Sequence, residues 1–177
     1  MKFISTGLDG AFVIEIEPIV DERGHFARAW CRREFEAAGI RLDFVQANIA
    51  FSKKKGTLRG MHYQKAPNAE VKLLSCVRGS VFDVMIDLRP NSPTFKKWFG
   101  IELTAGNHKM VYVPEGFAHG YLTTAAATEV FYPVSAYYTP AAEDGVRWND
   151  PAFGIVWPQT EDLIISKKDE NWPDFKG

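Results

Sequence analysis

The sequence predicts an all-β protein, folded as a barrel or a double-sheet jelly roll. Short apolar runs separated by turn residues recur along the whole chain, as in antiparallel β folds. Only one short helical pattern stands out among them. Many strands at short spacing with little helix are typical of barrels and jelly rolls. The chain contains no linker, repeat or low-complexity tract, so we expect residues 1–177 to form a single domain.

The expected strands follow one another closely. In chain order they are Ala11–Glu17, His25–Trp30, Phe44–Ser52, Thr57–Gln64, Val71–Val77, Val81–Leu88, Lys97–Leu103, Lys109–Val113, Gly120–Thr124 and Thr128–Tyr138. Tight connections are expected at Arg78-Gly79-Ser80 and Ala105-Gly106-Asn107, because Gly and Asn tolerate positive φ. One short helix is expected at Arg32–Ala38 and should end at Gly39. The polar tail after Trp157 is expected to be irregular or helical.

The alternation of side chains within two of these runs predicts a ligand-holding interior. In Val81–Leu88 the apolar residues share one face, so Asp83 and Asp87 point away from it. In the last long strand, Tyr132 and Tyr138 project to the same side. A small barrel whose mouth or interior accepts such polar side chains can hold a ligand.

Composition and charge exclude several classes of partner. The chain is 46% hydrophobic and 24% charged, with a formal net charge of −1, so no global field attracts nucleic acid or an anionic membrane. Cys31 and Cys76 are expected to be free thiols in a reducing cytoplasm. The start of the chain does not read as a signal peptide, and no stretch approaches the roughly 18 apolar residues of a membrane span. We expect a cytoplasmic protein.

Two of the four histidines, His62 and His119, lie beside glycines and raise the question of a metal site. Cupin-type jelly rolls place a His-x-His pair on one motif and a further His after Pro-x-Gly-x-x on a second. The second motif is present as Pro114-x-Gly116-x-x-His119, but Gln64 stands where the first motif would carry its second imidazole. A neutral amide is a poor ligand beside imidazole, so we expect no metal and no cofactor. A metal-dependent cupin enzyme remains the alternative.

Without a metal, the same residues suit proton transfer. A histidine such as His62 is the natural base near neutral pH. Lys72 lies in an apolar strand, either as a rim lysine or as a fixed cation that stabilises a developing enolate. Tyr132 is a candidate acid on the opposite wall. Each of these residues is also an ordinary strand residue, so the assignment depends on their combination.

Arginines are the candidate binders of an anionic ligand. Arg23 and Arg59 have the forked geometry that suits a diphosphate, and Phe26 or Tyr138 could stack on a base. In a regular strand, however, Arg59 faces away from a residue three positions later, His62. A site that contains both therefore requires a bulge in the strand between them.

Several stretches of the sequence, taken together and in order, carry a family resemblance. They are DERGHF (Asp21–Phe26), LRGMHYQ (Leu58–Gln64), VKLLSCVRGSVFDVMIDLR (Val71–Arg89), NSPTF (Asn91–Phe95), VPEGFAHGY (Val113–Tyr121), RWNDP (Arg147–Pro151) and SKKD (Ser166–Asp169). From about Gly10 to Asp169 the chain resembles the dTDP-4-dehydrorhamnose 3,5-epimerase family, the cupin-fold enzymes of dTDP-rhamnose and related deoxysugar pathways. The resemblance implies a cupin-type jelly roll and a metal-free isomerase. Its substrate would be a nucleotide-linked 4-keto-6-deoxyhexose, with C3, C5 or both inverted.

The resemblance also implies roles for individual residues. His62 would be the base that removes the proton beside the C4 ketone, and Asp169 the carboxylate that orients and charges it. Asp83 is a rival for that orienting role. Tyr132 would return a proton to the opposite face, and Lys72 would stabilise charge on the C4 oxygen.

Substrate contacts follow from the same resemblance. Arg59 and Arg23 would bind the diphosphate, with Arg23 reaching across from the partner subunit of a homodimer. His119 would help to hold the sugar. The remaining nucleotide and sugar contacts would be Phe26, Gln46, Asn48, Tyr138, Glu143 and Lys168.

Three positions depart from the family pattern, and one of them is Ser75, which stands where the family commonly carries a larger or basic residue. Arg28 stands where the family usually has a glutamate that accepts the thymine N3 proton, and an arginine can only donate. Another nucleotide, such as CDP, is therefore an alternative to dTDP. Pro133 follows Tyr132, where a proline removes one donor from the strand ladder. A sugar-nucleotide binding protein without turnover is the third functional alternative.

Overall fold

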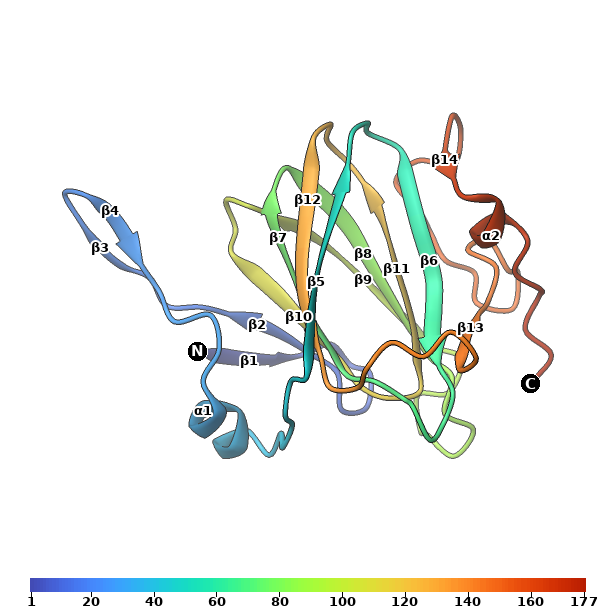
Figure 1. Ribbon diagram of the computed structural model, residues 1–177, viewed down its shortest axis with the longest axis horizontal. Coiled ribbons are helices and arrows are strands. Elements are labelled where there is room, and N and C mark those ends of the chain that lie inside the picture. Colours follow the sequence, from blue (N-terminus) through green and yellow to red (C-terminus); the bar gives the residue numbers. More distant parts are fainter.

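Two antiparallel sheets face each other in the computed structural model, which describes residues 1–177 (Figure 1). The first sheet has the order β1 (Lys2–Ser5), β2 (Phe12–Glu15), β10 (Lys109–Val113), β7 (Lys72–Arg78), β12 (Thr128–Val134) and β5 (Gln46–Ser52). The second has the order β13 (Glu143–Gly145), β6 (Thr57–Gln64), β11 (Phe117–Thr123), β8 (Ser80–Asp87) and β9 (Trp98–Thr104). A short strand, β14 (Ile164–Ile165), pairs with β6 in parallel. The prediction of a double-sheet, jelly-roll fold is confirmed.

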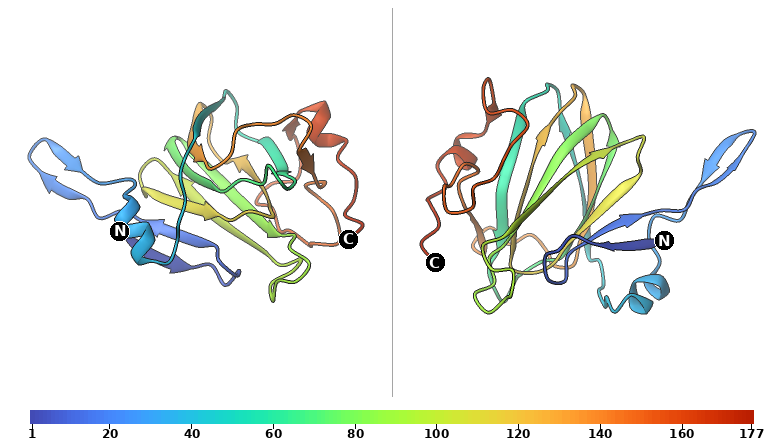
Figure 2. Two further views of the ribbon diagram at one scale, coloured as in Figure 1. Left: turned by 60° about the horizontal axis from the view of Figure 1, so that its bottom comes forward. Right: turned by 180° about the vertical axis from the view of Figure 1, so that it is seen from behind.

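Three elements lie outside these sheets. Strands β3 (Ile19–Asp21) and β4 (Gly24–Phe26) form a hairpin, which we call the arm. The arm projects away from the two sheets in every view (Figures 1 and 2). Helix α1 (Arg32–Ala37) follows it, and helix α2 (Lys167–Glu170) lies near the C-terminus, on the far side of the sheets from the arm. Neither helix is long and apolar enough to cross a membrane.

The expected elements agree closely with the observed ones in the two sheets. Thr57–Gln64 and Lys109–Val113 coincide with β6 and β10, and the other sheet strands are displaced by a few residues. The predicted tight connections both lie between strands, with Gly79 at φ +73°. Helix α1 ends one residue earlier than expected, before Gly39 at φ +81°.

Two expected strands are too long. The strand predicted at His25–Trp30 ends at Phe26, because Trp30 packs on Phe35 and Phe44 and directs the chain toward α1. The strand predicted at Thr128–Tyr138 ends at Val134. Beyond it the chain is held by backbone and side-chain bonds between Ser135 and Val71, so Tyr138 does not continue the face that carries Tyr132.

Four of the shortest strands were not predicted from the sequence. These are β1, β3, β13 and β14, and each has two to four residues. Strands this short carry little periodicity of their own, and they form because a neighbouring strand offers an edge to pair with.

Three apolar clusters stabilise this arrangement. The first lies between the sheets and includes Leu74, Met85 and Val111. The second covers the outer face of the second sheet, where Trp157 and Phe153 of the C-terminal segment pack on residues such as Val84 and Ile86. The third seats α1 against β2 and β10 through Phe35, Ile14 and Tyr112. Each fully buried large apolar side chain contributes about 1.5–3 kcal/mol relative to its exposed state.

The strand alternation in β8 is as predicted. Val84 and Ile86 belong to the outer apolar cluster, whereas Asp83 and Asp87 lie on the inner face and are fully buried. The second sheet therefore turns acidic side chains toward the space between the sheets.

The bulge that the sequence analysis required near Gly60 is confirmed. His62 stands opposite His119, but Arg59 stands opposite Tyr121, so β6 has one more residue than β11 over this stretch. Gly60 adopts φ +129°, and a Cβ there would come within 2.6 Å of the Gly120 Cα. Only glycine fits this conformation and this close approach of two backbones. The bulge turns Arg59 and His62 toward the same side of the strand.

Substituting Gly60→Ala is expected to lower the free energy of unfolding by more than about 1–3 kcal/mol, because it adds backbone overlap to a strained φ. Urea unfolding monitored by circular dichroism measures this loss. The matched control is Gly154→Ala, at φ +61°, where an added methyl group would meet no heavy atom within 4 Å. Equal losses at the two positions would show that the contact with β11 contributes nothing.

Candidate active site

A cavity of 460 Å³ opens between the two sheets and is closed on one side by the C-terminal segment. The first sheet contributes Lys72 and Tyr132 to its lining, and the second contributes Arg59, His62 and His119. A smaller cavity of 270 Å³ adjoins it and shares His62, Lys72 and Tyr132 with it. The further residues that line the smaller cavity are Gln46, Asn48, Tyr63, Gln64, Glu70, Tyr138 and Glu143.

The C-terminal segment supplies the partner of His62. The imidazole Nε2 lies 2.6 Å from Oδ1 of Asp169, whose other oxygen accepts the Gly60 N–H at 3.2 Å. Asp169 is held in place because Ser166 caps α2, its Oγ accepting the Asp169 N–H. Asp169 is buried, whereas the His62 side chain is 27% exposed toward the cavities. A carboxylate in this position orients the imidazole and leaves its second ring nitrogen without a partner in the chain.

The charge state of Asp169 follows from these contacts. Burial raises the pKa of its carboxyl group, but the hydrogen bonds from His62 and Gly60 outweigh burial, so the pKa is lowered overall. The carboxylate is therefore ionised at neutral pH. An ionised carboxylate at this distance can balance the positive charge that a histidine base carries after it accepts a proton from a substrate.

Asp83, the sequence-based rival for this role, contacts the other histidine. Its Oδ2 lies 2.8 Å from Nε2 of His119, and both side chains are buried. The two histidines face each other across β6 and β11, and each has a carboxylate of its own.

Lys72 and Tyr132 enter the cavity from the first sheet. Lys72 pairs with Glu70 at 3.2 Å, and both side chains are largely buried. Lys72 stands opposite Val134, two residues after Tyr132 along β12, so the two side chains share the inner face. Burial and the nearby Glu70 raise the pKa of Tyr132, and Arg59 partly offsets this. The phenol is therefore protonated at neutral pH. Pro133 lies within β12, opposite Ala47, and the strand continues through it.

A chain of polar contacts forms the rim of the smaller cavity. Glu143 accepts hydrogen bonds from Tyr138 at 2.8 Å and from Lys168 at 2.5 Å. Gln46 donates to Asn48 and accepts the Tyr138 backbone N–H. Five of the predicted substrate contacts are thus joined in one network beside His62.

Arg59 lies at the rim of the larger cavity. Its guanidinium group donates to the Phe51 carbonyl at 3.2 Å and to Ser52 Oγ at 3.4 Å, which holds it against β5. Lys72 and Lys168 line the same cavity, so three cationic side chains surround the space.

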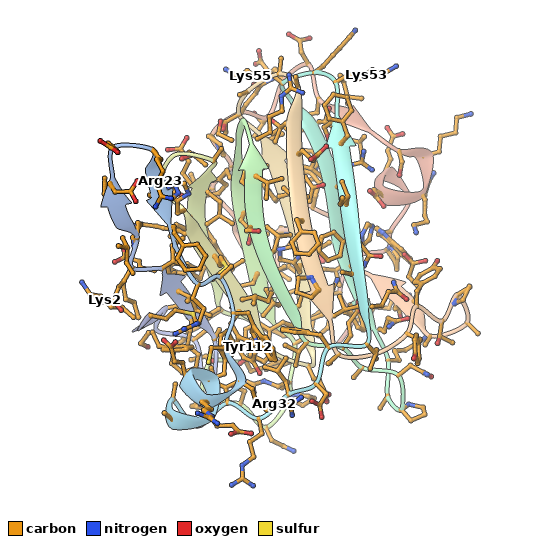
Figure 3. All side chains as sticks on the ribbon, turned by 60° about the vertical axis from the view of Figure 1, so that its left-hand side comes forward. Lys2, Arg23, Arg32, Lys53, Lys55 and Tyr112 are labelled. Atoms are coloured by element: carbon orange, nitrogen blue, oxygen red, sulfur yellow. The ribbon has the colours of Figure 1, made fainter.

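Three predicted site residues lie away from both cavities. Arg23 is on the arm (Figure 3). It pairs with Asp21, and its side chain is 84% exposed. Phe26 is 73% exposed and is the last residue of β4, where it pairs with Ile19 at the base of the arm. Arg28 pairs with Glu34, which also accepts a hydrogen bond from the N-terminal amine. These residues do not reach the site of their own chain.

Several neighbours of the site were not assigned to it from the sequence. Gln64, which occupies the position of a cupin imidazole, joins the β6–β7 loop to the β12–β13 loop by bonding Asn68 in the first and Tyr137 and Thr139 in the second. Trp172 approaches the His62 ring edge-on, at 6.1 Å between ring centroids. Tyr121 lies two residues after His119 on the same face of β11, a spacing that the strand period makes visible. No three His, Cys, Asp or Glu side chains form a group that could hold a metal ion.

Comparisons with known proteins agree on one family. The family model described as dTDP-4-dehydrorhamnose 3,5-epimerase matches residues 5–177. The enzyme of that name from Methanothermobacter thermautotrophicus is 43% identical over 97% of this chain and 92% of its own length. The Salmonella typhimurium enzyme is 41% identical over 98% of this chain and 94% of its own.

Solved structures show the same likeness. The dTDP-4-dehydrorhamnose 3,5-epimerase from Elizabethkingia anophelis superposes with a TM-score of 0.96 at 42% identity, covering 99% of this chain and 97% of that one. The Bacillus anthracis enzyme, solved with TDP and PPi, has a TM-score of 0.95 at 41% identity, covering 98% and 99%. The match extends over the sheets, the arm and the C-terminal segment that carries Asp169. This chain belongs to the dTDP-4-dehydrorhamnose 3,5-epimerase family.

Proposed function

We propose that this chain is a sugar-nucleotide epimerase that inverts C3, C5 or both in a nucleotide-linked 4-keto-6-deoxyhexose. The observation that carries the proposal is the pairing of His62 with Asp169 in a cavity that also contains Lys72 and Tyr132. A related epimerase from Legionella pneumophila, 37% identical, was solved in complex with dTDP-4-keto-L-rhamnose. The residues needed for proton removal, charge stabilisation and proton return are therefore gathered in one place.

The proposed reaction has two proton transfers. The free ring nitrogen of His62 takes the acidic proton from the carbon beside the C4 ketone, and the electron pair moves to the ketone oxygen as an enolate. Lys72 stabilises the negative oxygen, and Asp169 stabilises the imidazolium. Tyr132, which approaches from the other sheet, returns a proton to the opposite face of the carbon. The net result is inversion, with no change in oxidation state.

The remaining site residues hold the substrate in this proposal. Arg59 binds the diphosphate, and His119 binds the sugar between the sheets. The network at the rim of the smaller cavity adds nucleotide and sugar contacts through Gln46, Asn48, Tyr138, Glu143 and Lys168. None of these assignments requires a metal or another cofactor.

We also propose that the enzyme is a cytoplasmic, single-domain homodimer whose sites are completed across the interface. The arm exposes Ile19, Val20 and Phe26 at 71–75% of their surface. The outer face of the first sheet exposes Ile49, Phe51, Val77 and Phe131. Apolar surface of this extent on neighbouring elements is typical of an interface between protein chains. An arm that docks on a partner would bring Arg23 and Phe26 to the partner's site.

The shared site predicts complementation between two inactive variants. His62→Asn removes the base, and Arg23→Ala removes a diphosphate contact. After the two proteins are mixed and allowed to exchange subunits, half of the dimers are mixed. Each mixed dimer has one site with both original residues, so activity should recover to about a quarter of the unaltered level in a two-fold symmetric dimer. Coupled turnover assays measure this recovery. No recovery, with subunit exchange verified, would place Arg23 outside the partner's site.

The residue at position 28, an arginine, predicts which nucleotide base the enzyme prefers. A guanidinium donates hydrogen bonds, which suits cytosine N3 or a carbonyl better than the thymine N–H. In a thermal-shift panel of dTDP, UDP, CDP and GDP we expect CDP to raise the Tm most. A ligand at 100 times its Kd should raise Tm by about 5–10 °C in a chain of this size. A clear preference for dTDP would defeat the Arg28 argument and leave the epimerase assignment intact.

A further inference from the structure

Two buried carboxylates on the inner face of β8 differ sharply in their hydrogen bonding. Asp87 accepts hydrogen bonds from Arg89, Ser92 and Thr94, and these donors satisfy both of its oxygens. Asp83 is equally buried, but its only hydrogen bond joins Oδ2 to His119. Its Oδ1 has no partner in the chain. Both oxygens of Asp87 are therefore hydrogen-bonded within the chain, whereas one oxygen of Asp83 is not.

A second unpartnered polar atom lies on the neighbouring strand. Tyr121 stands directly opposite Asp83 in the β8–β11 ladder, so both side chains are on the same inner face. Tyr121 is 5% exposed, and its hydroxyl group is buried with no hydrogen-bond partner. The residue lines the larger cavity beside His119. An unsatisfied donor and an unsatisfied acceptor are thus cross-strand neighbours.

The two atoms are chemically complementary. Leaving a buried polar group unpaired is energetically costly, so two such groups side by side call for a shared partner. A protonated phenol donates one hydrogen bond, and a carboxylate oxygen only accepts. A water molecule can accept from the first and donate to the second, and buried waters in proteins commonly bridge such groups.

We propose that Asp83 Oδ1 and the Tyr121 hydroxyl bind one buried water, and that Tyr121 acts through it as a positioning residue for His119. The inference rests on the proposed function, in which His119 holds the sugar. Asp83 then has both oxygens fixed, one by His119 and one by the water. A carboxylate held at both oxygens cannot turn about its Cβ–Cγ bond, so the His119 ring has one orientation and one tautomer at the cavity floor.

Other titratable groups lie near this pair, but none of them replaces the water. Besides Asp83 itself, the titratable groups that act on the Tyr121 hydroxyl are Arg59 from β6, Tyr132 from β12 and Cys76 from β7. None of them makes a hydrogen bond to it. The position of Tyr121 among them places its hydroxyl inside the protein and away from bulk solvent.

Tyr121→Phe tests the proposal because it removes one oxygen and keeps the ring in the apolar cluster. Tyr112→Phe is the matched control, since Tyr112 is a similarly buried ring on β10, in the cluster under α1. We expect Tyr121→Phe to lower kcat roughly 10-fold with little change in KM, because a misoriented His119 holds the sugar slightly out of line with His62, and such misplacement affects the transition state most. The Tyr112 variant should leave both constants unchanged.

A spectroscopic measurement separates positioning from simple loss of packing. The side-chain ¹⁵N signals of His119, assigned by their absence in His119→Asn, should change in Tyr121→Phe and stay unchanged in Tyr112→Phe. High-resolution crystal structures should show the water in the unaltered protein and its loss in the Tyr121 variant. If Tyr121→Phe does not fold, Asp83→Asn, which keeps the side-chain volume, should change the same His119 signals and displace or reorient the same water.

Two results would overturn the inference. One is an unaltered protein with no water between Asp83 and Tyr121 at high resolution. The other is a folded Tyr121→Phe variant whose His119 signals and kcat match those of the unaltered protein. Absence of epimerase activity in the unaltered protein would instead refute the proposed function, and the water and the His119 signals would still test this inference.

Discussion

Replacing His62 with asparagine is expected to abolish the exchange of solvent deuterium into C3 and C5 of the substrate. An ionised carboxylate holds one ring nitrogen of His62 at 2.6 Å, and the other ring nitrogen is free of partners in the chain. Asparagine has a similar reach but no basic nitrogen. Because a positioned base contributes about 10²–10⁴-fold, the exchange rate should fall by at least this factor. Mass spectrometry of the substrate after incubation in deuterium oxide measures it.

A second histidine-to-asparagine substitution controls for the change itself. His108 lies in the turn before β10 at φ +51°, a conformation that asparagine tolerates well, and it lines neither cavity. His108→Asn should leave the exchange unchanged. Undiminished exchange in His62→Asn would remove His62 from the mechanism. Tight ligand binding without any exchange in the unaltered protein would favour a binding protein without turnover.

Asp169→Asn is expected to have the second largest effect, with kcat reduced by about 10²-fold or more. Asparagine is nearly isosteric, so it keeps the Ser166 cap of α2, but its amide is a donor as well as an acceptor. With the amide NH₂ toward His62, the contacted ring nitrogen becomes the acceptor, and the proton moves to the nitrogen that should act as the base. The imidazolium also loses its negative neighbour. Steady-state kinetics should show the loss mainly in kcat.

The same substitution has a signature in the pH dependence of stability. Asp169 has a pKa below its ordinary value in the folded state, so its contacts stabilise the fold fully above the ordinary carboxyl pKa. This contribution is lost as the pH falls through the lowered, folded-state pKa. The difference in unfolding free energy between the unaltered protein and Asp169→Asn should therefore shrink between neutral and strongly acidic pH. Urea unfolding across that range measures it.

A surface carboxylate provides the control. Asp174 pairs with Arg147 and is 54% exposed, so Asp174→Asn should change kcat and acid stability little. If Asp169→Asn retained full activity, the orienting role would have to pass to another group, and the 2.6 Å contact with His62 would be structural only.

Most of the fold was predictable because its main strands are recognisable from local sequence. β6 and β10 lie between clear turn residues, and Gly79 marks the connection between β7 and β8. The end of β4 in the arm was harder to predict, because the residues after Phe26 do not themselves end a strand. The strand ends there because Trp30 packs on Phe35 of α1. The pair of residues in β14 has no pattern at all and is a strand only by its contact with β6.

Features of the site that follow from the alternation of side chains along one strand were predictable. Contacts between residues far apart in the sequence were not. The conflict between Arg59 and His62 on a regular strand required a bulge, and the bulge is present. By contrast, the choice between Asp83 and Asp169 depends on which carboxylate the fold brings to His62. Asp169 is 107 positions away in sequence and lies in a helix of four residues, so only the family resemblance singled it out. Local chemistry cannot supply that information.

The bulge at Gly60 has a consequence for substrate selection, because it places Arg59 and His62 on one side of the strand at a fixed separation. Arg59 and His62 belong to one strand, so their separation is set by covalent geometry, at most about 10 Å for three extended residues. In the proposed reaction Arg59 binds the diphosphate on C1, and His62 contacts the carbon that loses its proton. The fixed separation of Arg59 and His62 on the strand then selects substrates by the distance between their diphosphate and the carbon that loses its proton. In a substrate with a sugar ring of another size, or with a linkage one bond longer, the acidic proton would lie out of reach of His62.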